Sequence, residues 1–285
     1  MTMTKTKTKK PKNIKRLIVE IITLGSAAIL FGIPYLFVLL NSFMPSRQAA
    51  QMNLALPTEW MIIENYTRVF ETANRMVVTG FRNSTFITFF AVLILILVCA
   101  PMAFYIQRRA TRLGTIISFV ILTGLMIPPA IVPTIWILQG LGLHGERFGL
   151  ILVQVALSIP FTTMLFRGFI STIPKEIDEA AVLDGCGTLA LFYRVITPML
   201  KPVMATVVII SSIGIFNDFT NAMYFLPGAR NATVQLSLFN FMGRYASDWN
   251  LLFANVVIIS VPMLILFVIF NKQIVTGITS GAIKG

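Results

Sequence analysis

Residues 171–202 read STIPKEIDEAAVLDGCGTLALFYRVITPMLKP, a polar segment between two strongly apolar ones. The segment holds charged side chains of both signs, at Lys175, Glu176, Asp178, Glu179, Asp184, Arg194 and Lys201. So many charges cannot lie in hydrocarbon, where each charged group is costly. We therefore predict an ordered polar loop on one side of a membrane.

The layout of this loop predicts two short helices joined by a hinge. Pro174 suits a first helical position, and acidic residues follow it in the first turns, where the helix dipole favours negative charge. Gly185 and Gly187 are expected to end this helix, because glycine tolerates the backbone that a helix C-terminus needs. The second helix is expected to begin near Thr188.

The second helix is expected to be amphipathic. Leu189, Phe192 and Ile196 follow one another at helical spacing and would form one apolar face. Pro198 and Pro202 are expected to end the helix before the next span. Two helices of this size cannot form a core of their own. Their apolar faces therefore need a partner, either the ends of the protein's own spans or another subunit.

The motif in this loop resembles the EAA loop of the permease subunits of ABC importers. The match is carried by Glu179-Ala180-Ala181, Asp184-Gly185, Phe192, Ile196, Pro198 and Pro202. The resemblance implies that residues 171–202 form a coupling loop that docks in a groove on a separate ATP-binding subunit. The implied coupling residues are Glu179, Ala180, Ala181, Asp184, Gly185, Phe192, Ile196 and Pro198. Among them, Glu179 would anchor to a basic residue of that subunit. An ordinary amphipathic cytoplasmic loop is the alternative.

Composition predicts a membrane protein, because 56% of the 285 residues are hydrophobic and only 12% are charged. Six apolar runs are long enough to cross a bilayer, at about 17–40, 84–106, 115–138, 148–166, 203–226 and 251–270. We predict an all-α fold with one transmembrane permease domain over residues 17–285. Residues 1–16 are rich in lysine and predict a disordered basic cytoplasmic tail. The two cysteines offer no metal-ligand spacing and no disulfide framework.

The distribution of basic residues orients these spans. If the N-terminus is inside, the Lys and Arg residues of outside segments are only Arg47, Arg68, Arg75, Arg82, Arg147, Arg230 and Arg244, out of 23 in the chain. The positive-inside rule then places both termini and the loop at 171–202 in the cytoplasm. The same bias explains the net charge of +12 without nucleic acid as a partner.

The outside segment at about 41–83 is predicted to be ordered. Its residues Glu64-Asn65-Tyr66-Thr67, Phe70 and Asn83-Ser84 are similar to a stretch of the same permease family. Two interpretations stay open. The segment either packs against the ends of the spans or contacts a partner directly.

Prolines and polar residues mark two of the predicted spans. Pro128, Pro129 and Pro133 bend the third span, either as part of a pathway that opens or as a static kink. In the fifth span the polar residues are Asn217, Asp218 and Asn221, which would share one helix face. They are candidates for lining the substrate pathway and hydrogen-bonding sugar hydroxyls. The alternative is that they join helices or line an outer gate.

The C-terminal residues Gly277–Gly285 resemble the tail of maltose-type sugar permeases, where the tail reaches toward the ATPase dimer. The alternative is a frayed glycine-rich end. Asp184 is followed directly by Gly185, as in the sugar permeases of the family. Cys186 and Gly187 depart from the residues common there, which loosens the hinge without changing the assignment.

Absent motifs narrow the function classes. The chain has no phosphate-binding loop of the G-x-x-x-x-G-K-[ST] type and no H-E-x-x-H, and its only histidine is His144. We therefore predict no catalytic residue, no metal and no cofactor in this chain, with ATP and Mg²⁺ bound by the partner ATPase. A secondary carrier usually has paired ionisable residues near the membrane midplane, whereas Asp218 is a single carboxylate off-centre.

The resemblance implies a permease subunit of an ATP-driven carbohydrate importer, with the six-helix fold of type I importers, in a bacterial-type plasma membrane. Oligosaccharide is the expected substrate class. The implied partners are two copies of an ATP-binding subunit, a second homologous permease, an extracytoplasmic sugar-binding protein and the lipid bilayer. The alternatives are an ion-coupled secondary carrier and an ABC permease for a non-sugar solute.

Overall fold

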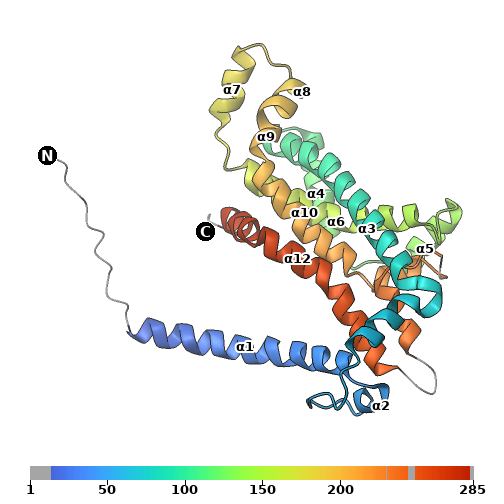
Figure 1. The fold of residues 1–285 in the computed structure, drawn as a ribbon. Coiled ribbons are helices and arrows are strands. Elements are labelled where there is room, and N and C mark those ends of the chain that lie inside the picture. The colour runs from blue at the N-terminus through green and yellow to red at the C-terminus, as the bar shows by residue number, and fades with distance from the viewer. Residues whose placement is uncertain (1–13, 229, 243–247, 283–285) are drawn as a thin grey trace.

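The computed structural model describes residues 14–228, 230–242 and 248–282, and its elements are helices (Figure 1). They are α1 (Ile14–Phe43), α2 (Ser46–Ala49), α3 (Ile62–Arg108), α4 (Arg112–Met126), α5 (Ile131–Gly140), α6 (Arg147–Ile170), α7 (Lys175–Leu183), α8 (Thr188–Ala190), the π-helix η1 (Leu191–Ile196), α9 (Thr197–Met199), α10 (Lys201–Phe216), α11 (Thr220–Phe225), the 3₁₀-helix η2 (Gln235–Phe241) and α12 (Trp249–Ala282). The predicted all-α class is confirmed for these ranges.

The core of the protein is built around α3. This helix packs most extensively against α6, and α10 and α12 also pack against it. The larger buried cluster contains Leu95 of α3, Phe166 of α6 and Val207 of α10, each completely removed from solvent. Burying side chains of this size stabilises the packed state by about 1.5–3 kcal/mol each.

Four helices are long and apolar enough to cross a membrane, within residues 18–43, 75–108, 147–170 and 249–270. A fifth span is possible if the bent pair at 188–199 and 201–216 counts as one, while α4 and α5 are shorter apolar helices. These elements cover all six predicted spans. The count of six and the cytoplasmic position of both termini stay predictions.

The third predicted span is divided in two. Helix α4 ends at Met126, and α5 begins at Ile131 after a break that contains Pro128 and Pro129. Proline removes a backbone donor and clashes with the preceding turn, which is why the helix stops here. Pro133 lies in the first turn of α5, where no donor is needed.

The fifth predicted span is also interrupted, and this corrects the expected helix face. Helix α10 ends at Phe216, and α11 begins only at Thr220. Asn217, Asp218 and Asn221 therefore lie at a break and at the start of a new helix instead of along one continuous face. The competing factor is capping, because Asn and Asp side chains bond to nearby backbone groups at helix ends.

The segment at 41–83, predicted to lie outside, is largely helical, because α3 begins at Ile62 and continues into the candidate span at 75–108. Asn65 is buried and donates to the carbonyls of Ser42 and Met44, both at 2.9 Å. Tyr66 hydrogen-bonds the Ser42 hydroxyl at 3.1 Å. Burial raises the pKa of the Tyr66 phenol, and this hydrogen bond partly offsets the rise. Asn65 and Tyr66 of the motif thus bond to the protein's own chain, whereas Glu64, Thr67 and Phe70 are exposed.

A second part of the outside motif fixes the loop that follows α11. Asn83 donates to the carbonyl of Ala232 at 3.0 Å, and the Ser84 hydroxyl accepts the Val234 amide at 3.0 Å. The approach is so close that a Cβ on Gly80 would lie 2.8 Å from the Val234 Cα. Packing against the span ends is therefore what these residues do in this chain.

Helix α1 extends away from the bundle, and α12 is its main neighbour (Figure 1). None of its apolar window is buried within the chain, and Phe31 is 73% exposed. Residues 1–13 of the predicted basic tail lie outside the described residues. So do Ile283–Gly285 of the glycine-rich C-terminus, whereas Gly277–Ala282 continue α12 as helix.

Candidate functional site: the loop at 171–202

The first arm of the loop is α7, which ends at the predicted glycine. Asp184 caps the helix, and Gly185 follows with φ of +84°, a left-handed backbone that favours glycine. The Gly185 amide donates to the carbonyl of Val182 at 3.0 Å, and the Cys186 amide donates to that of Ala181 at 2.9 Å. This pair of bonds is a Schellman motif, which satisfies carbonyls that the helix end leaves free.

The second arm begins at Thr188, as predicted, but it is not a regular α-helix. After one turn of α8 the chain widens into the π-helix η1, and the Thr197 hydroxyl donates to the Phe192 carbonyl at 2.9 Å. Phe192 and Ile196 are buried as expected, whereas Leu189 is 74% exposed. The wider π turn changes the angular spacing of side chains, so Leu189 leaves the buried face.

The two prolines of the second arm begin helices, which corrects the prediction that they end one. Pro198 lies in the first turn of α9, and Pro202 in the first turn of α10. At these positions the missing proline N–H has no helical acceptor to lose. The chain bends by 72° between Met199 and Lys201, so the arm meets α10 at a sharp corner.

Large apolar side chains are exposed on both arms near the hinge. They are Val182, Leu183, Leu189 and Tyr193, with exposed fractions of 57%, 88%, 74% and 60%. We call this set the coupling tip. In Figure 1 both arms project beyond the ends of the long helices. Apolar groups this exposed at the end of a polar loop are typical of a surface that meets another protein.

The predicted coupling residues divide into two groups. Glu179, Ala180, Asp184, Gly185 and Pro198 are exposed. For Glu179 the structure records no hydrogen bond or ion pair with any described residue.

The second group faces the chain's own core, and it consists of Ala181, Phe192 and Ile196. Phe192 stacks near Phe104 of α3 with ring centroids 5.3 Å apart. Ala181 is the one buried residue of α7.

Two arginines that link the loop to α3 were not identified from the sequence. The Nε of Arg108 lies 2.7 Å from Oδ2 of Asp178, and its Nη2 donates to the Ile173 carbonyl at 2.9 Å. The Nη2 of Arg109 donates to the Thr188 hydroxyl at 2.8 Å. In the sequence these arginines counted only toward the positive-inside bias, because their partners lie 65 or more residues away.

The candidate pathway residues form a hydrogen-bonded cluster around Asp218. Its Oδ1 accepts the Asn221 amide at 3.1 Å, and its Oδ2 accepts the Asn221 side-chain nitrogen at 2.7 Å. Buried Gln154 of α6, which sequence reasoning missed, also donates to Oδ2. Asn217 is exposed and accepts from Gln235 at 3.1 Å. Asp218 thus joins α6 to α11, Asn217 contacts η2, and Asn217 is the most exposed of the three predicted pathway residues.

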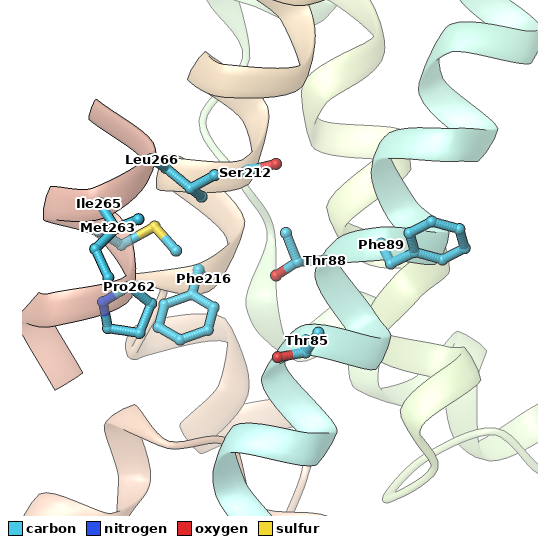
Figure 2. Close-up of a pocket in the computed structure, with 9 residues that line it drawn as sticks. All are labelled: Thr85, Thr88, Phe89, Ser212, Phe216, Pro262, Met263, Ile265 and Leu266. Atoms are coloured by element: carbon cyan, nitrogen blue, oxygen red, sulfur yellow. The ribbon is translucent and has the colours of Figure 1, made fainter. Parts of the chain in front are cut away.

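A separate cavity of about 480 Å³ lies between α3, α10 and α12 (Figure 2). It is lined by Thr85, Thr88, Phe89, Ser212, Phe216, Pro262, Met263, Ile265 and Leu266. Figure 2 shows the hydroxyls of Thr85 and Thr88 on the side of α3 that faces Phe216, while the Phe89 ring points the other way. Most of the lining is apolar, which suits hydrocarbon better than a sugar with many hydroxyls.

Within the described ranges no three His, Cys, Asp or Glu side chains are grouped as metal ligands would be. The free cysteines are buried Cys99 and partly exposed Cys186. The loop at 171–202 thus presents exposed apolar side chains and is held on α3.

Comparison with protein families gives one clear match. The model described as "Binding-protein-dependent transport system inner membrane component" matches residues 94–280, which include the whole loop.

Curated relatives match nearly the full chain. The melibiose/raffinose/stachyose import permease protein of Bacillus subtilis is 32% identical over 271 residues, which cover 93% of this chain and 97% of that protein. The diacetylchitobiose uptake system permease protein of Streptomyces coelicolor is 33% identical, with 88% and 84% covered. The multiple sugar-binding transport system permease protein of Streptococcus mutans is 31% identical, with 93% and 95% covered.

Among solved structures, one chain of a bacterial ABC transporter involved in the import of the acidic polysaccharide alginate has the same fold. The TM-score is 0.79 at 23% identity, and the match covers 94% of this chain and 99% of that one.

Proposed function

Because the chain belongs to the family of binding-protein-dependent transport system inner membrane components, a family of multi-pass membrane proteins, we propose that it is a permease subunit of an ATP-driven carbohydrate importer. The observation that carries the proposal is the near full-length similarity to permeases named for sugar uptake. Several of these names refer to di- and oligosaccharides, so we infer an oligosaccharide as the substrate class.

The loop at 171–202 is the part of the chain through which a separate ATPase would act. ATP and Mg²⁺ would be bound by that ATPase, present as two copies, and this chain would pair with a second homologous permease. Moving a two-state bundle from 1:99 to 99:1 requires about 5.5 kcal/mol of preference for one state. The coupling tip supports this role, because exposed apolar side chains of this kind are typical of a surface that binds another protein.

Two side chains of the loop are assigned different tasks in docking. Leu183, the most exposed member of the coupling tip, would fill an apolar groove of the ATPase. Glu179, exposed on the same helix, would pair with a basic residue at the rim of that groove. An extracytoplasmic sugar-binding protein would deliver substrate to the opposite side, where Asn217 offers an open amide to sugar hydroxyls.

The test is co-purification of the tagged chain with the ATP-binding subunit, together with ATP-dependent uptake of an oligosaccharide such as raffinose. We expect Leu183→Asp and Glu179→Lys to abolish uptake and weaken association, because each places a charge where the partner surface is complementary to the native group. Leu54→Asp is the matched control, since Leu54 is also exposed but belongs to the segment at 41–83 that is predicted to lie outside. It should leave association unchanged.

Two results would count against the proposal. A wild-type chain that transports alone in response to an ion gradient would make it a secondary carrier. A complex that contains the ATPase but imports a non-sugar solute would keep the permease role and reject the carbohydrate assignment.

A further inference from the structure

The turn between α3 and α4 holds the two arms of the coupling loop with two adjacent arginines. Arg108 is the last residue of α3, and its side chain is only 8% exposed where it meets Asp178, itself 16% exposed. The guanidinium bonds the Ile173 carbonyl as well, at 2.9 Å. A single buried side chain thus fixes both the start of α7 and the segment that leads into it.

The second arm is held differently. Arg109 and Thr188 are both exposed, and one hydrogen bond of 2.8 Å joins them. A cleft of about 170 Å³ lies beside this contact, between the end of α3 and the side chains of Leu189 and Tyr193. The first arm is therefore clamped by a buried ion pair, and the second by an exposed bond with free space beside it.

The backbone between these contacts is suited to bend. Gly185 lies between the arm held by Arg108 and the arm held by Arg109, and its left-handed conformation sets the angle between them. The turn that carries the arginines is itself fixed, because the Thr111 side chain caps α4 by accepting the Gly114 amide at 3.1 Å. Tyr105 adds a 3.0 Å hydrogen bond to Thr111.

We propose that Arg108 is the positioning residue that transmits movement of the coupling loop to α3, and that Arg109 guides the second arm. A loop pushed by the ATPase would move α3 directly through the Arg108–Asp178 pair. Since α3 packs against α6, α10 and α12, its displacement reaches most of the bundle. This inference rests on the proposed importer function, and it concerns where the force enters the membrane part.

Arginine is suited to this task because its planar guanidinium can bond a carboxylate and a carbonyl at once, whereas lysine is a single point donor. Removing one partner of a buried ion pair leaves the other charge without compensation. Loss of Arg108 should therefore weaken the link between loop and helix without removing the surface that binds the ATPase.

The experiment measures sugar transported per ATP hydrolysed, using the complete importer with its binding protein in proteoliposomes and raffinose as the probe. For Arg108→Ala we expect this ratio to fall about fivefold or more, within the usual range of coupling between sites, while assembly and ATP hydrolysis persist. Asp178→Ala should have the same effect, and the double variant should be no worse than either single one, because both remove one interaction. Arg108→Lys should restore part of the ratio.

Arg112→Ala is the matched control, because it removes one charge from an exposed position of the same turn. Its ratio should equal that of the wild type. Asp178→Asn keeps the side-chain volume and removes the charge. It replaces Arg108→Ala as the test variant if Arg108→Ala fails to accumulate in the membrane. A wild-type ratio in Arg108→Ala or in Asp178→Asn would overturn this inference alone, whereas a wild-type chain that binds no ATPase would overturn the proposed function.

Discussion

Asp218 combines a charge with a position at a helix break. Its two carboxylate oxygens accept from the Asn221 backbone, the Asn221 side chain and buried Gln154. Asp218 lies one residue before Phe219, the N-cap of α11, and by accepting the Asn221 amide it satisfies a free backbone donor in the first turn of that helix. The group therefore joins α11 to α6, and its bonding capacity is largely used within the chain.

Asp218→Ala should destabilise the protein. The variant leaves the Asn221 backbone amide and the Gln154 side-chain amide without their acceptor, which together costs about 2 kcal/mol. We expect the thermal midpoint of the purified complex to fall by about 5 °C, with the ATPase still associated. Asp218→Asn keeps one side-chain oxygen as an acceptor, so its thermal midpoint should lie between those of the wild type and Asp218→Ala. An unchanged midpoint in the alanine variant would show that the cluster contributes no stability.

Asn217→Ala, in contrast to Asp218→Ala, should change substrate uptake and leave the stability of the protein nearly unchanged. Asn217 is exposed at the same break, and among the described residues its side chain has one recorded hydrogen-bond partner, Gln235 at 3.1 Å. We expect the KM for oligosaccharide uptake to rise about threefold to tenfold with little change in the thermal midpoint, since a neutral hydrogen bond contributes about 0.5–1.5 kcal/mol. The comparison separates a residue that contacts substrate from one that holds helices together. Wild-type uptake kinetics would remove Asn217 from the pathway.

At the scale of elements, the hinge between α7 and α8 depends on one backbone conformation. Gly185→Val should abolish uptake while the protein stays in the membrane. A β-branched residue is strongly disfavoured at φ of +84°, so the arms would change their angle. Gly187→Ala is the control, because Gly187 has φ of −68°, which any residue adopts. Uptake and membrane level should be measured together in both variants, and normal uptake in Gly185→Val would reject the hinge.

The same loop shows what could be predicted from the sequence. The residues next to the hinge predict that α7 ends before Gly185 and that the next helix begins at Thr188, because helix ends depend on a few adjacent residues. The π-helix was missed, since no residue pattern distinguishes it from an α-helix in advance. Its wider turn is the reason that Leu189 is exposed while Phe192 is buried.

Long-range partners could not be predicted. Gln154 and Arg108 each read as an unremarkable residue of a helix, and their roles depend on Asp218 and Asp178, 64 and 70 residues away. Asp218 was recognised as unusual because a carboxylate in a span is costly, but the break at which it lies became visible only with both helices in place. Composition predicts that a polar group needs a partner, and only the fold shows which one.

At the scale of the whole molecule, much of the apolar surface is exposed. Helix α1 has none of its apolar window buried, and α12 has only 22% of its window buried. In a membrane protein this apolar surface contacts lipid tails or other helices of a complex, so its exposure within the single chain does not destabilise the fold. The positive-inside bias predicts that the coupling tip lies on the cytoplasmic side of the membrane.

Cys186 provides a native reporter of that side. It is the partly exposed one of the two cysteines and lies next to the hinge, whereas Cys99 is buried in the core. A membrane-impermeant maleimide should therefore leave right-side-out vesicles unlabelled and should label inside-out vesicles at Cys186. Binding of the ATPase should slow the reaction, because it covers the exposed arms on either side of the hinge.

The controls use the opposite face and the second thiol. Trp60→Cys in a Cys186→Ala background places the reporter at a 61% exposed position of the outside segment, so its labelling should show the reverse sidedness. Cys99→Ala with native Cys186 should label as the wild type does, since a buried thiol reacts poorly. Labelling of Cys186 from outside would place the loop on the wrong face for any cytoplasmic ATPase, and both the orientation and the coupling role would then be wrong.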